Sequence, residues 1–373
     1  MRTKKPWLKH YPDGTPKVLE FDPRRTLVTL LDESEAKYSS HLAFTNFDVS
    51  IDYTKIAEDS RSFAAYLQNV LGLKKGDRIA MMMPNLLQYP IAIFGALRAG
   101  LIVVNVNPLY TPRELKHQLQ DSGAKAIIIF ENSAHVLSAI NDDVQIEHVI
   151  ITKIGDYLGL KGYLMNFILK YIKRMVPSHK LKNTIPFKKT LERPVADFNE
   201  VIISVDDLAF LQYTGATTGL SKGSMLSHGN VAANIEQLKS MLNDVVEEGT
   251  EIWINALPMY HIYSLVVLVF SGYDAGGLNV LVTNPRDTKG FVNELKKWPF
   301  TFFNGVNTLY ESLLNHPDIV NVDFSNMKLS GTGGSACRQS TAERWQELTG
   351  KVLLEGYGLS ETSPSVTVSP NYL

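Results

Sequence analysis

Segments typical of strands and of helices alternate along the first part of this chain, and that alternation restricts the possible folds most. The predicted order is strand, helix, strand, helix, strand, over Gly76–Met83, Leu87–Ala99, Ile102–Val106, Glu114–Ser122 and Ala126–Phe130. Thr111 and Pro112 precede the second helix in the favoured cap and first-turn positions. A β-α-β-α-β order predicts a mainly parallel sheet with helices on both faces.

The residues before this region predict helices around a short pair of strands, Ala43–Phe47 and Val49–Tyr53. The helix that follows the pair places Phe63, Leu67 and Val70 on one face.

A second alternating region lies between residues 251 and 355. Its predicted segments are Glu251–Leu257, Asn279–Val282, the helix Thr288–Trp298, Phe300–Gly305, the helix Thr308–Asn315, Met327–Ser330 and Lys351–Glu355. This order predicts a second helix-covered sheet that packs against the first. We expect one α/β unit over 1–200 and a second over 201–373, and no internal repeat is visible.

Composition excludes several classes of protein. The 373 residues carry a net charge of −1, which gives no support for nucleic-acid binding, because such proteins show a clear basic excess. The single cysteine, Cys337, rules out an internal disulfide framework and favours a reducing cytosol. The basic N-terminus lacks the apolar core of a secretory signal, and no apolar run of about 18 residues predicts a spanning helix.

The stretch Tyr213–Asn230, YTGATTGLSKGSMLSHGN, concentrates glycine and hydroxyl side chains around one lysine, Lys222. Backbone N–H groups in such a loop can face an anion, and threonine hydroxyls and the lysine can add donors. The Walker pattern fails here, and a flexible linker is the other reading of the composition. The flanks favour the anion site, because a strand over Leu208–Tyr213 precedes the loop and Ser227 or Asn230 can cap a following helix.

Three further motifs follow predicted strands. Leu257–His261, LPMYH, offers a histidine that is either a core residue or a site residue, and the apolar run Ile262–Phe270 after it is either core or the wall of a binding cavity. Gly331–Ala336, GTGGSA, with Glu355 further along, imitates a dinucleotide-binding fingerprint. An NAD(P)-linked oxidoreductase is therefore a rival interpretation. The third motif is Glu355–Glu361, EGYGLSE.

The order YTGATTGLSKG resembles the phosphate-binding signature of the adenylate-forming enzymes, the superfamily of acyl-CoA synthetases, luciferases and nonribosomal-peptide adenylation domains. GDRIAMMMPN and GLIVVNVNPLYTPREL resemble the first characteristic blocks of that family. From Trp7 to Pro370 the chain is similar to bacterial long-chain fatty-acid–CoA ligases. The resemblance implies two helix-covered, mainly parallel sheets plus an incomplete smaller β subdomain.

The resemblance also implies roles for individual residues. The implied catalytic residues are Thr214, Lys222, His261 and Glu361, with Thr214 and Glu361 at Mg²⁺ and His261 orienting the acyl carboxylate. The implied ATP-binding residues are Tyr213, Thr214, Gly215, Thr217, Thr218, Gly219, Lys222, Gly223, Gly333, Gly334, Glu355, Gly356, Tyr357 and Ser360. The implied reaction joins a long-chain fatty acid to ATP, forming acyl-AMP, and then to coenzyme A.

Three departures from the family pattern qualify these roles. The family continues beyond Glu361 with a ribose-binding aspartate, a hinge and a small C-terminal domain that carries a catalytic lysine, none of which can be assigned here. Ala216 and Thr332 stand where the family favours glycine, and Ser360 replaces the usual threonine. A catalytically incomplete fragment that binds fatty acid or nucleotide without turnover is therefore a second alternative, and a homodimer is left open.

The segment 159–189 combines apolar residues at helical spacing with a cluster of lysines. Tyr163, Phe167 and Tyr171 represent the apolar positions, and Lys170, Lys173, Arg174, Lys180, Lys182, Lys188 and Lys189 are the basic ones. Such a helix either lies on an anionic bilayer or packs on its own domain. The first reading predicts a cytoplasmic protein bound peripherally to the inner face of the cell membrane.

Overall fold

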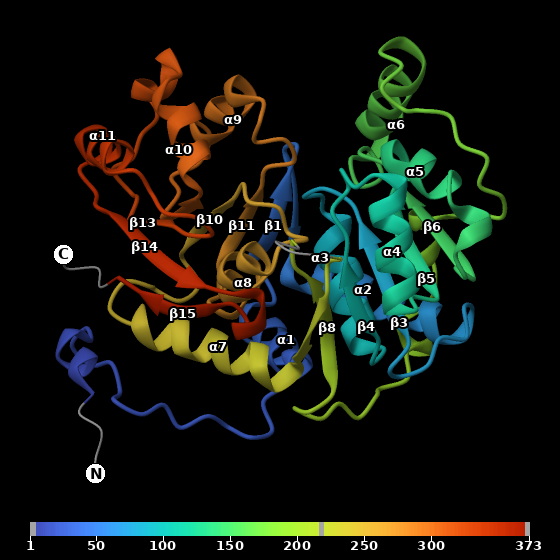
Figure 1. The fold of residues 1–373 in the computed structure, drawn as a ribbon, viewed down its shortest axis with the longest axis horizontal. Coiled ribbons are helices and arrows are strands. Elements are labelled where there is room, and N and C mark those ends of the chain that lie inside the picture. The colour runs from blue at the N-terminus through green and yellow to red at the C-terminus, as the bar shows by residue number, and fades with distance from the viewer. Residues whose placement is uncertain (1–4, 216–219, 370–373) are drawn as a thin grey trace.

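The computed structural model describes residues 5–215 and 220–369. Their strands form two sheets that stand side by side, one at the right and one at the left of Figure 1. In the order of its neighbours, the first sheet contains β7 (Ile185–Pro186), β6 (His148–Thr152), β5 (Ala126–Phe130), β3 (Arg78–Met82), β4 (Ile102–Asn105), β8 (Leu208–Tyr213) and β9 (Gly223–Ser227). All its pairings are parallel except the last, between β8 and β9.

The second sheet lies at the left of Figure 1. Its order is β15 (Ser365–Val368), β14 (Leu353–Gly358), β13 (Leu329–Thr332), β12 (Phe302–Gly305), β10 (Ile252–Asn255), β11 (Leu278–Leu281), β1 (Leu42–Asn46) and β2 (Val49–Asp52). Only the two outermost pairings are antiparallel. The fold is therefore mixed α/β with two mainly parallel sheets. Every strand of the described residues belongs to one of these sheets, so the expected smaller β subdomain does not form a separate sheet there.

The two sheets exchange strands across residue 200. β1 and β2 come from the first unit predicted from the sequence, yet β1 pairs with β11 in the second sheet. β8 and β9 come from the second predicted unit, yet β8 pairs with β4 in the first sheet. A division at residues 200 and 201 remains a prediction about folding units, but the sheets themselves do not divide there.

Helices fill the space between the sheets and cover their outer faces. The α-helices are α1 (Leu27–Tyr38), α2 (Tyr53–Asn69), α3 (Gln88–Arg98), α4 (Pro112–Ser122), α5 (Ala134–Ser138), α6 (Gly159–Phe167), α7 (His228–Met241), α8 (Ser271–Asp274), α9 (Thr288–Leu295), α10 (Asn307–Leu314) and α11 (Gln339–Thr349). Every residue of α3 is buried, because this helix lies between the two sheets (Figure 1). The outer face of the first sheet packs on α4 and α5, and that of the second on α9, α10 and α11.

Local sequence signals account for several element boundaries. Thr111 and Glu114 form a reciprocal capping box at the start of α4, as Thr111 and Pro112 predict. α2 ends at Asn69, one residue before Val70, whose side chain is 45% exposed. The prediction that Val70 shares a helical face with Phe63 and Leu67 is therefore wrong, since the helix ends before it reaches that position.

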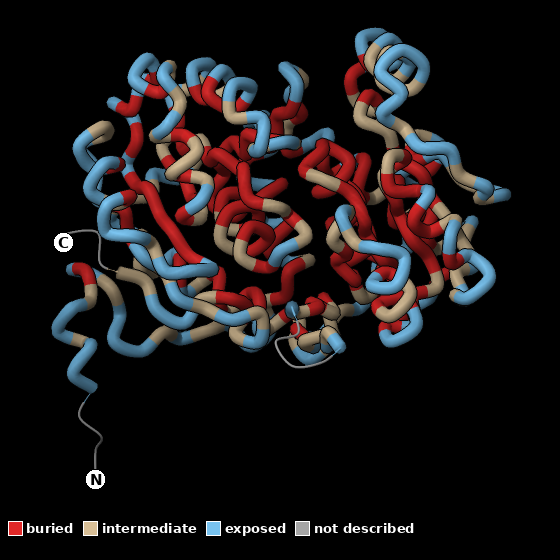
Figure 2. The backbone as a smooth tube through the Cα atoms, turned by 45° about the horizontal axis from the view of Figure 1, so that its top comes forward, coloured by how far each residue is buried: buried red, intermediate tan, exposed pale blue. Residues whose placement is uncertain are grey.

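One apolar core joins the two halves. It contains residues of both sheets and of α2, α3 and α8, and the rings of Tyr53 and Tyr273 stack in it at 4.3 Å. The Tyr53 hydroxyl donates to the carbonyl oxygens of Tyr273 at 3.0 Å and Gly277 at 3.1 Å. The inner strands and α3 are buried, whereas α6 and the residues after it form an exposed projection at the upper right of Figure 2.

Candidate active site

A cavity of 750 Å³ runs from the carboxyl edge of β13 and β14 down between the second sheet and α7. Its walls come from segments that are far apart in the sequence. The residues predicted from the motifs that line it are Thr214, Gly215, His261, Gly333, Gly334, Gly356, Tyr357, Ser360 and Glu361. The structure therefore brings the ends of four separate motifs into one space.

Four other predicted residues do not line this cavity. Tyr213 is buried, and its hydroxyl donates to Asp121 on α4. Lys222 and Gly223 lie on the other arm of the hairpin, where the Lys222 carbonyl accepts the Thr214 N–H at 3.2 Å. Glu355 accepts the Cys337 N–H at 3.2 Å. Thr217, Thr218 and Gly219, together with Ala216, lie outside the described residues.

The loop after β8 leads into a strand, not directly into a helix. β9 returns antiparallel to β8, with Gly223 opposite Tyr213 and Ser227 opposite Leu208. Ser227 caps α7 through a capping box with Asn230, which confirms one of the two predicted caps. Because α7 starts at the far end of this hairpin, its N-terminus does not face the loop. The expected strand, loop and helix arrangement is therefore wrong.

His261 stands at the end of the turn that follows β10 and reaches the open space of the cavity. The cavity walls displace bulk water around the imidazole, and this desolvation lowers the pKa of His261. Its Nδ1 accepts the backbone N–H of Tyr263 at 3.3 Å. The ring is therefore neutral at physiological pH and is suited to orienting a ligand without adding a charge.

Two amide side chains hold this turn, and the sequence patterns did not identify either. Asn85 donates through Nδ2 to the carbonyls of Asn255 at 3.0 Å and Leu257 at 2.9 Å, and its Oδ1 accepts the Met259 N–H at 2.9 Å. Gln212 donates through Nε2 to the Tyr260 carbonyl at 2.9 Å. Gln212 lies on β8 of the first sheet and Asn85 in the loop after β3, and both fix a turn that follows β10 of the second sheet. The only sequence signals were their places at the end of GDRIAMMMPN and directly before Tyr213.

The inner part of the cavity is apolar. Its walls there are made by Leu238, Met241, Leu242, Trp253, Val267, Phe302, Leu329, Leu354 and Val368. Of the apolar run Ile262–Phe270, only Ile262, Tyr263 and Val267 reach the cavity, and most of the others are buried in the core. Most of the apolar lining comes instead from α7 and from the strands of the second sheet.

The loop of the GTGGSA motif is closely packed at its start. A Cβ on Gly331 would lie 2.2 Å from Asn304 Oδ1, which already accepts the Tyr263 hydroxyl at 3.1 Å. Gly334 has a φ of +75°, in the region that favours glycine. Glu355 binds the backbone of this loop, whereas the dinucleotide fingerprint needs an acidic side chain for a ribose hydroxyl. The structure therefore does not favour the oxidoreductase interpretation.

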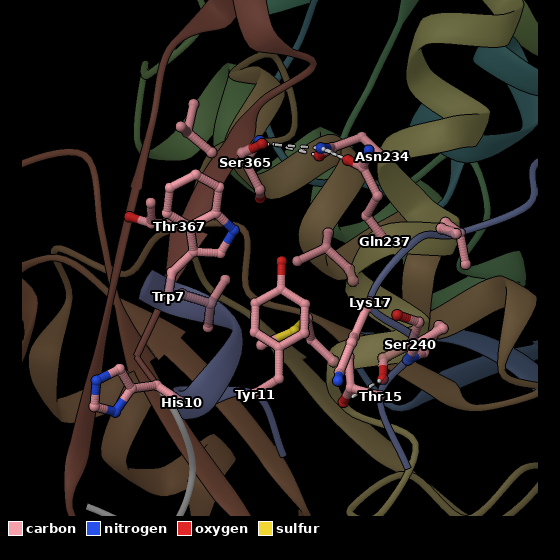
Figure 3. A pocket seen from close by; sticks show the side chains of 16 residues that line it. Trp7, His10, Tyr11, Thr15, Lys17, Asn234, Gln237, Ser240, Ser365 and Thr367 are labelled. Atoms are coloured by element: carbon pink, nitrogen blue, oxygen red, sulfur yellow. Dashed lines mark hydrogen bonds between the residues drawn. The ribbon is translucent and has the colours of Figure 1, made fainter. Parts of the chain in front are cut away.

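A second cavity, of 620 Å³, lies on the other side of α7 and β15 (Figure 3). The N-terminal segment covers it with Trp7 and Tyr11, and Asn234 ties α7 to β15 through hydrogen bonds to Ser365 of 2.9 and 3.0 Å. Thr15 donates to the Ser240 carbonyl at 3.3 Å. No predicted site residue lines this cavity.

A family model and curated relatives match most of this chain. The family model described as AMP-binding enzyme matches residues 31–372. The long-chain-fatty-acid–CoA ligase of Escherichia coli O157:H7 is 50% identical over 98% of this chain and 66% of its own length. The chain thus spans about two thirds of that curated relative.

Solved structures show the same fold. The anthranilate CoA ligase in complex with anthranoyl-AMP has a TM-score of 0.82 at 16% identity, over 94% of this chain and 63% of the other. The long-chain-fatty-acid–CoA ligase of Archaeoglobus fulgidus has a TM-score of 0.79 at 21% identity, over 97% and 69%.

Proposed function

Because the chain belongs to the family of AMP-binding enzymes, we propose that its 750 Å³ cavity activates a long-chain fatty acid with ATP. The products of this step are acyl-AMP and pyrophosphate, and in the whole protein the acyl group then passes to coenzyme A. One observation carries the proposal: a single cavity combines a polar mouth, built from the motif residues, with an apolar interior. The names of the curated relatives support the choice of a long-chain acid.

The chemistry requires positioning more than proton transfer. A carboxylic acid has a pKa of about 4.3, so the acyl carboxylate is already ionised at neutral pH and needs no base. One of its oxygens attacks the α-phosphorus, and the bond from that phosphorus to the pyrophosphate oxygen breaks. The neutral ring of His261 orients the carboxylate. Thr214 and Gly215 contribute hydroxyl and backbone groups at the phosphates, with Thr217, Thr218, Gly219 and Lys222 completing that loop.

The purine would lie at the carboxyl edge of β13 and β14. Tyr357 is 61% exposed and can stack on it, while Gly333, Gly334 and Gly356 leave room for its approach. Ser360 supplies a hydroxyl beside the phosphates. The apolar interior would then receive the acyl chain, with each buried methylene contributing about 0.8 kcal/mol.

The residues at the mouth fit a magnesium ion carried by the nucleotide. Glu361 lines the cavity, and its carboxylate forms no ion pair with any described residue. No cluster of three or more metal-ligating side chains occurs within residues 5–215 and 220–369. Mg²⁺ typically uses one or two carboxylates plus phosphate oxygens, so Glu361, with the Thr214 hydroxyl, is a sufficient protein contribution. The ion would neutralise charge on the triphosphate.

The test is palmitate-dependent exchange of labelled pyrophosphate into ATP, in the presence of Mg²⁺. We expect exchange with this chain and its loss in Glu361→Ala. Glu347→Ala is the matched control, because Glu347 is an exposed glutamate of α11 that does not line the cavity. Absence of exchange in a folded chain that still binds a stable acyl-AMP mimic would favour the binding-only alternative. Absence of binding as well would refute the proposed function.

We also propose peripheral contact with an anionic membrane surface through α6 and the π-helical turn Ile168–Ile172. The apolar side chains of this element are unusually exposed: Leu160 89%, Tyr163 65%, Phe167 53%, Tyr171 63% and Ile172 66%. Lys161, Lys173 and Arg174 accompany them, each worth about 1 kcal/mol at an anionic surface. Lys170 is not available for this role, because it pairs with Glu131 at 2.7 Å. No helix of the described residues has the length and apolarity needed to cross a bilayer.

Cosedimentation with vesicles tests the membrane contact. We expect binding to vesicles that contain phosphatidylglycerol and its loss in Phe167→Asp combined with Ile172→Asp. Val320→Asp is the control, since Val320 is 68% exposed at a distant site, beyond α10. Equal losses in both variants would contradict the proposal. A homodimer stays a prediction. Light scattering on the chain without vesicles tests it.

A further inference from the structure

A third cavity, of 700 Å³, separates the exposed helix from the second sheet. One wall is formed by α6 and the residues after it, and the other by the ends of β1 and β11 and by α9. The apolar lining comes from Leu164, Ile168, Leu169 and Met175 on the first wall and from Val282 and Phe291 on the second. We call this space the helix cleft. It shares no lining residue with the 750 Å³ cavity of the candidate active site.

The helix that forms the cleft is attached at its start, near its end and between these points, where Asn166 Oδ1 accepts the Gly155 N–H at 2.9 Å. At its start, Gly162 approaches Gly155 so closely that a Cβ on Gly162 would lie 1.9 Å from the Gly155 carbonyl oxygen. Near its end, Lys170 pairs with Glu131 at 2.7 Å. Leu164 and Ile168 lie between these attachments and line the cleft. The element is therefore attached along its length, while its apolar side chains Leu164 and Ile168 line the open space beside it.

The charged side chains that line the cleft differ in whether they form ion pairs. Lys161 and Lys173 line the helix wall, and neither forms an ion pair with any residue that the structure describes. On the opposite wall, Glu294 pairs with Lys297 at 3.0 Å, whereas Asp287 accepts the Gly290 N–H at 3.0 Å and forms no ion pair with any described residue. The cleft is therefore lined by two lysines and one carboxylate without ion pairs, and the excess of unpaired charge is positive.

The opposite wall connects to the turn of His261 through hydrogen bonds. Asn46, which lines the cleft, donates to the Thr283 hydroxyl at 3.1 Å, and that hydroxyl donates to the Asn85 carbonyl at 2.7 Å. Asn85 then holds the backbone of the turn that ends at His261. The cleft is therefore a neighbour of the candidate active site, although the two cavities are separate.

We propose that the helix cleft is a second binding site for a long-chain carboxylate. The alkyl chain would lie on the apolar lining and the carboxylate at the wall that carries Lys161 and Lys173. Two properties of the cleft match the two parts of such a ligand: its apolar lining suits the alkyl chain, and its lysines without ion pairs suit the carboxylate. The identity of the ligand rests on the proposed function. The site would hold the acid before it enters the active-site cavity.

Palmitate binding with the active site blocked tests this inference. The full chain is saturated with 5′-O-(N-palmitoylsulfamoyl)adenosine, a stable mimic of acyl-AMP, and titrated with palmitate below its micellar concentration in a calorimeter. We expect one further palmitate per chain. Ile168→Asp should weaken this binding at least tenfold, and Met165→Trp, which fills the cleft, should do the same. Leu160→Asp is the matched control, because Leu160 is an exposed residue of the same helix that does not line the cleft.

The lysines are tested separately. Lys161→Gln combined with Lys173→Gln should weaken the binding of palmitate several-fold. The same variant should leave the binding of hexadecanol unchanged, because hexadecanol lacks the carboxylate charge. The inference is overturned if the saturated chain takes up no palmitate, or if Leu160→Asp and Ile168→Asp reduce uptake equally. If the mimic itself does not bind, the proposed function fails. The cleft is then tested with palmitate alone, where one bound palmitate sensitive to Ile168→Asp is still expected.

Discussion

At the scale of single residues, the turn that carries His261 depends on an amide that lies far away in the sequence. Asn85 is 3% exposed and satisfies three backbone groups of residues 255–259. Buried backbone groups that lose their partners destabilise a protein more than the average hydrogen bond stabilises it, since water cannot replace the partner. Asn85 is therefore a positioning residue for the candidate site.

The Asn85→Ala variant tests this role. It leaves the Met259 N–H without a partner in the interior and removes one of two hydrogen bonds from each of two carbonyls. The Asn255 carbonyl keeps the Val282 N–H at 3.0 Å and the Leu257 carbonyl keeps the Ser264 hydroxyl at 2.8 Å. We therefore expect the free energy of unfolding to fall by about 3 kcal/mol. Guanidinium denaturation measures the change. Asn326→Ala is the control, because Asn326 is exposed and its nearest partner is the neighbouring Ser325 hydroxyl at 3.4 Å. A change below about 1 kcal/mol for Asn85→Ala would argue against the role.

At the scale of elements, α7 shows how local signals and burial combine. The capping box of Ser227 and Asn230 starts the helix, and its first residue, His228, is 1% exposed. Burial lowers the pKa of His228 to about 4, with Lys75 lowering it further and Asp207 raising it. The imidazole is therefore neutral when the chain is folded at physiological pH.

This burial predicts a pH-dependent stability. The pKa of His228 in the folded chain, about 4, lies below the value of about 6.5 in the unfolded chain. The unfolded state therefore binds more protons between these values, and stability is lost as the pH falls from 6.5 to 4. We expect the difference in free energy of unfolding between the native chain and His228→Gln to change by about 3 kcal/mol over this range. Parallel stability curves for the two proteins would contradict this expectation.

The attachment of α6 gives a second prediction for an element. A methyl group at Gly162 cannot be accommodated 1.9 Å from the Gly155 carbonyl oxygen, so Gly162→Ala should detach the start of the helix. We expect faster amide exchange over residues 155–172 while the exchange of β3 and β5 stays unchanged. Gly159→Ala is an unsuitable control, because Gly159 has a φ of +55°. Leu160→Ala, at an exposed position of the same helix, is the better one and should leave the exchange unchanged.

At the scale of the whole molecule, the exchanged strands make the two halves interdependent. β1 and β2 complete the second sheet, and β8 and β9 complete the first. The shared core contains residues of both sheets and of the helices between them. Neither half contains all the strands of either complete sheet when the chain is divided at residue 200.

This arrangement predicts a single cooperative unfolding transition. Far-UV circular dichroism and tryptophan fluorescence should give the same denaturation midpoint, since the core joins both sheets. Residues 1–200 and 201–373, produced separately, should each fail to show cooperative unfolding and should regain it on mixing. Independent folding of either fragment would instead support the two units predicted from the sequence.

Much of the fold and of the site could be predicted from local patterns. The predicted strand Ala126–Phe130 agrees residue for residue with β5, and Leu208–Tyr213 with β8. The spacing of apolar residues indicates whether a segment is a helix or a strand, and capping residues indicate where a helix begins and ends. Both signals depend only on residues that are close in the sequence. The motifs around Thr214, His261 and Glu361 predict a nucleotide site; one cavity contains all three residues, and their roles stay a prediction.

The sequence by itself thus determined the α/β class, the positions of most elements and the motif residues of the site. Only the tertiary structure decided which sheet each strand joins, that Tyr213 turns away from the cavity toward Asp121, and that Asn85 and Gln212 hold the turn of His261. The physical reason is how far apart in the sequence the contacting residues lie. A local pattern records how a segment is buried, whereas its partners are chosen by contacts between residues more than a hundred positions apart.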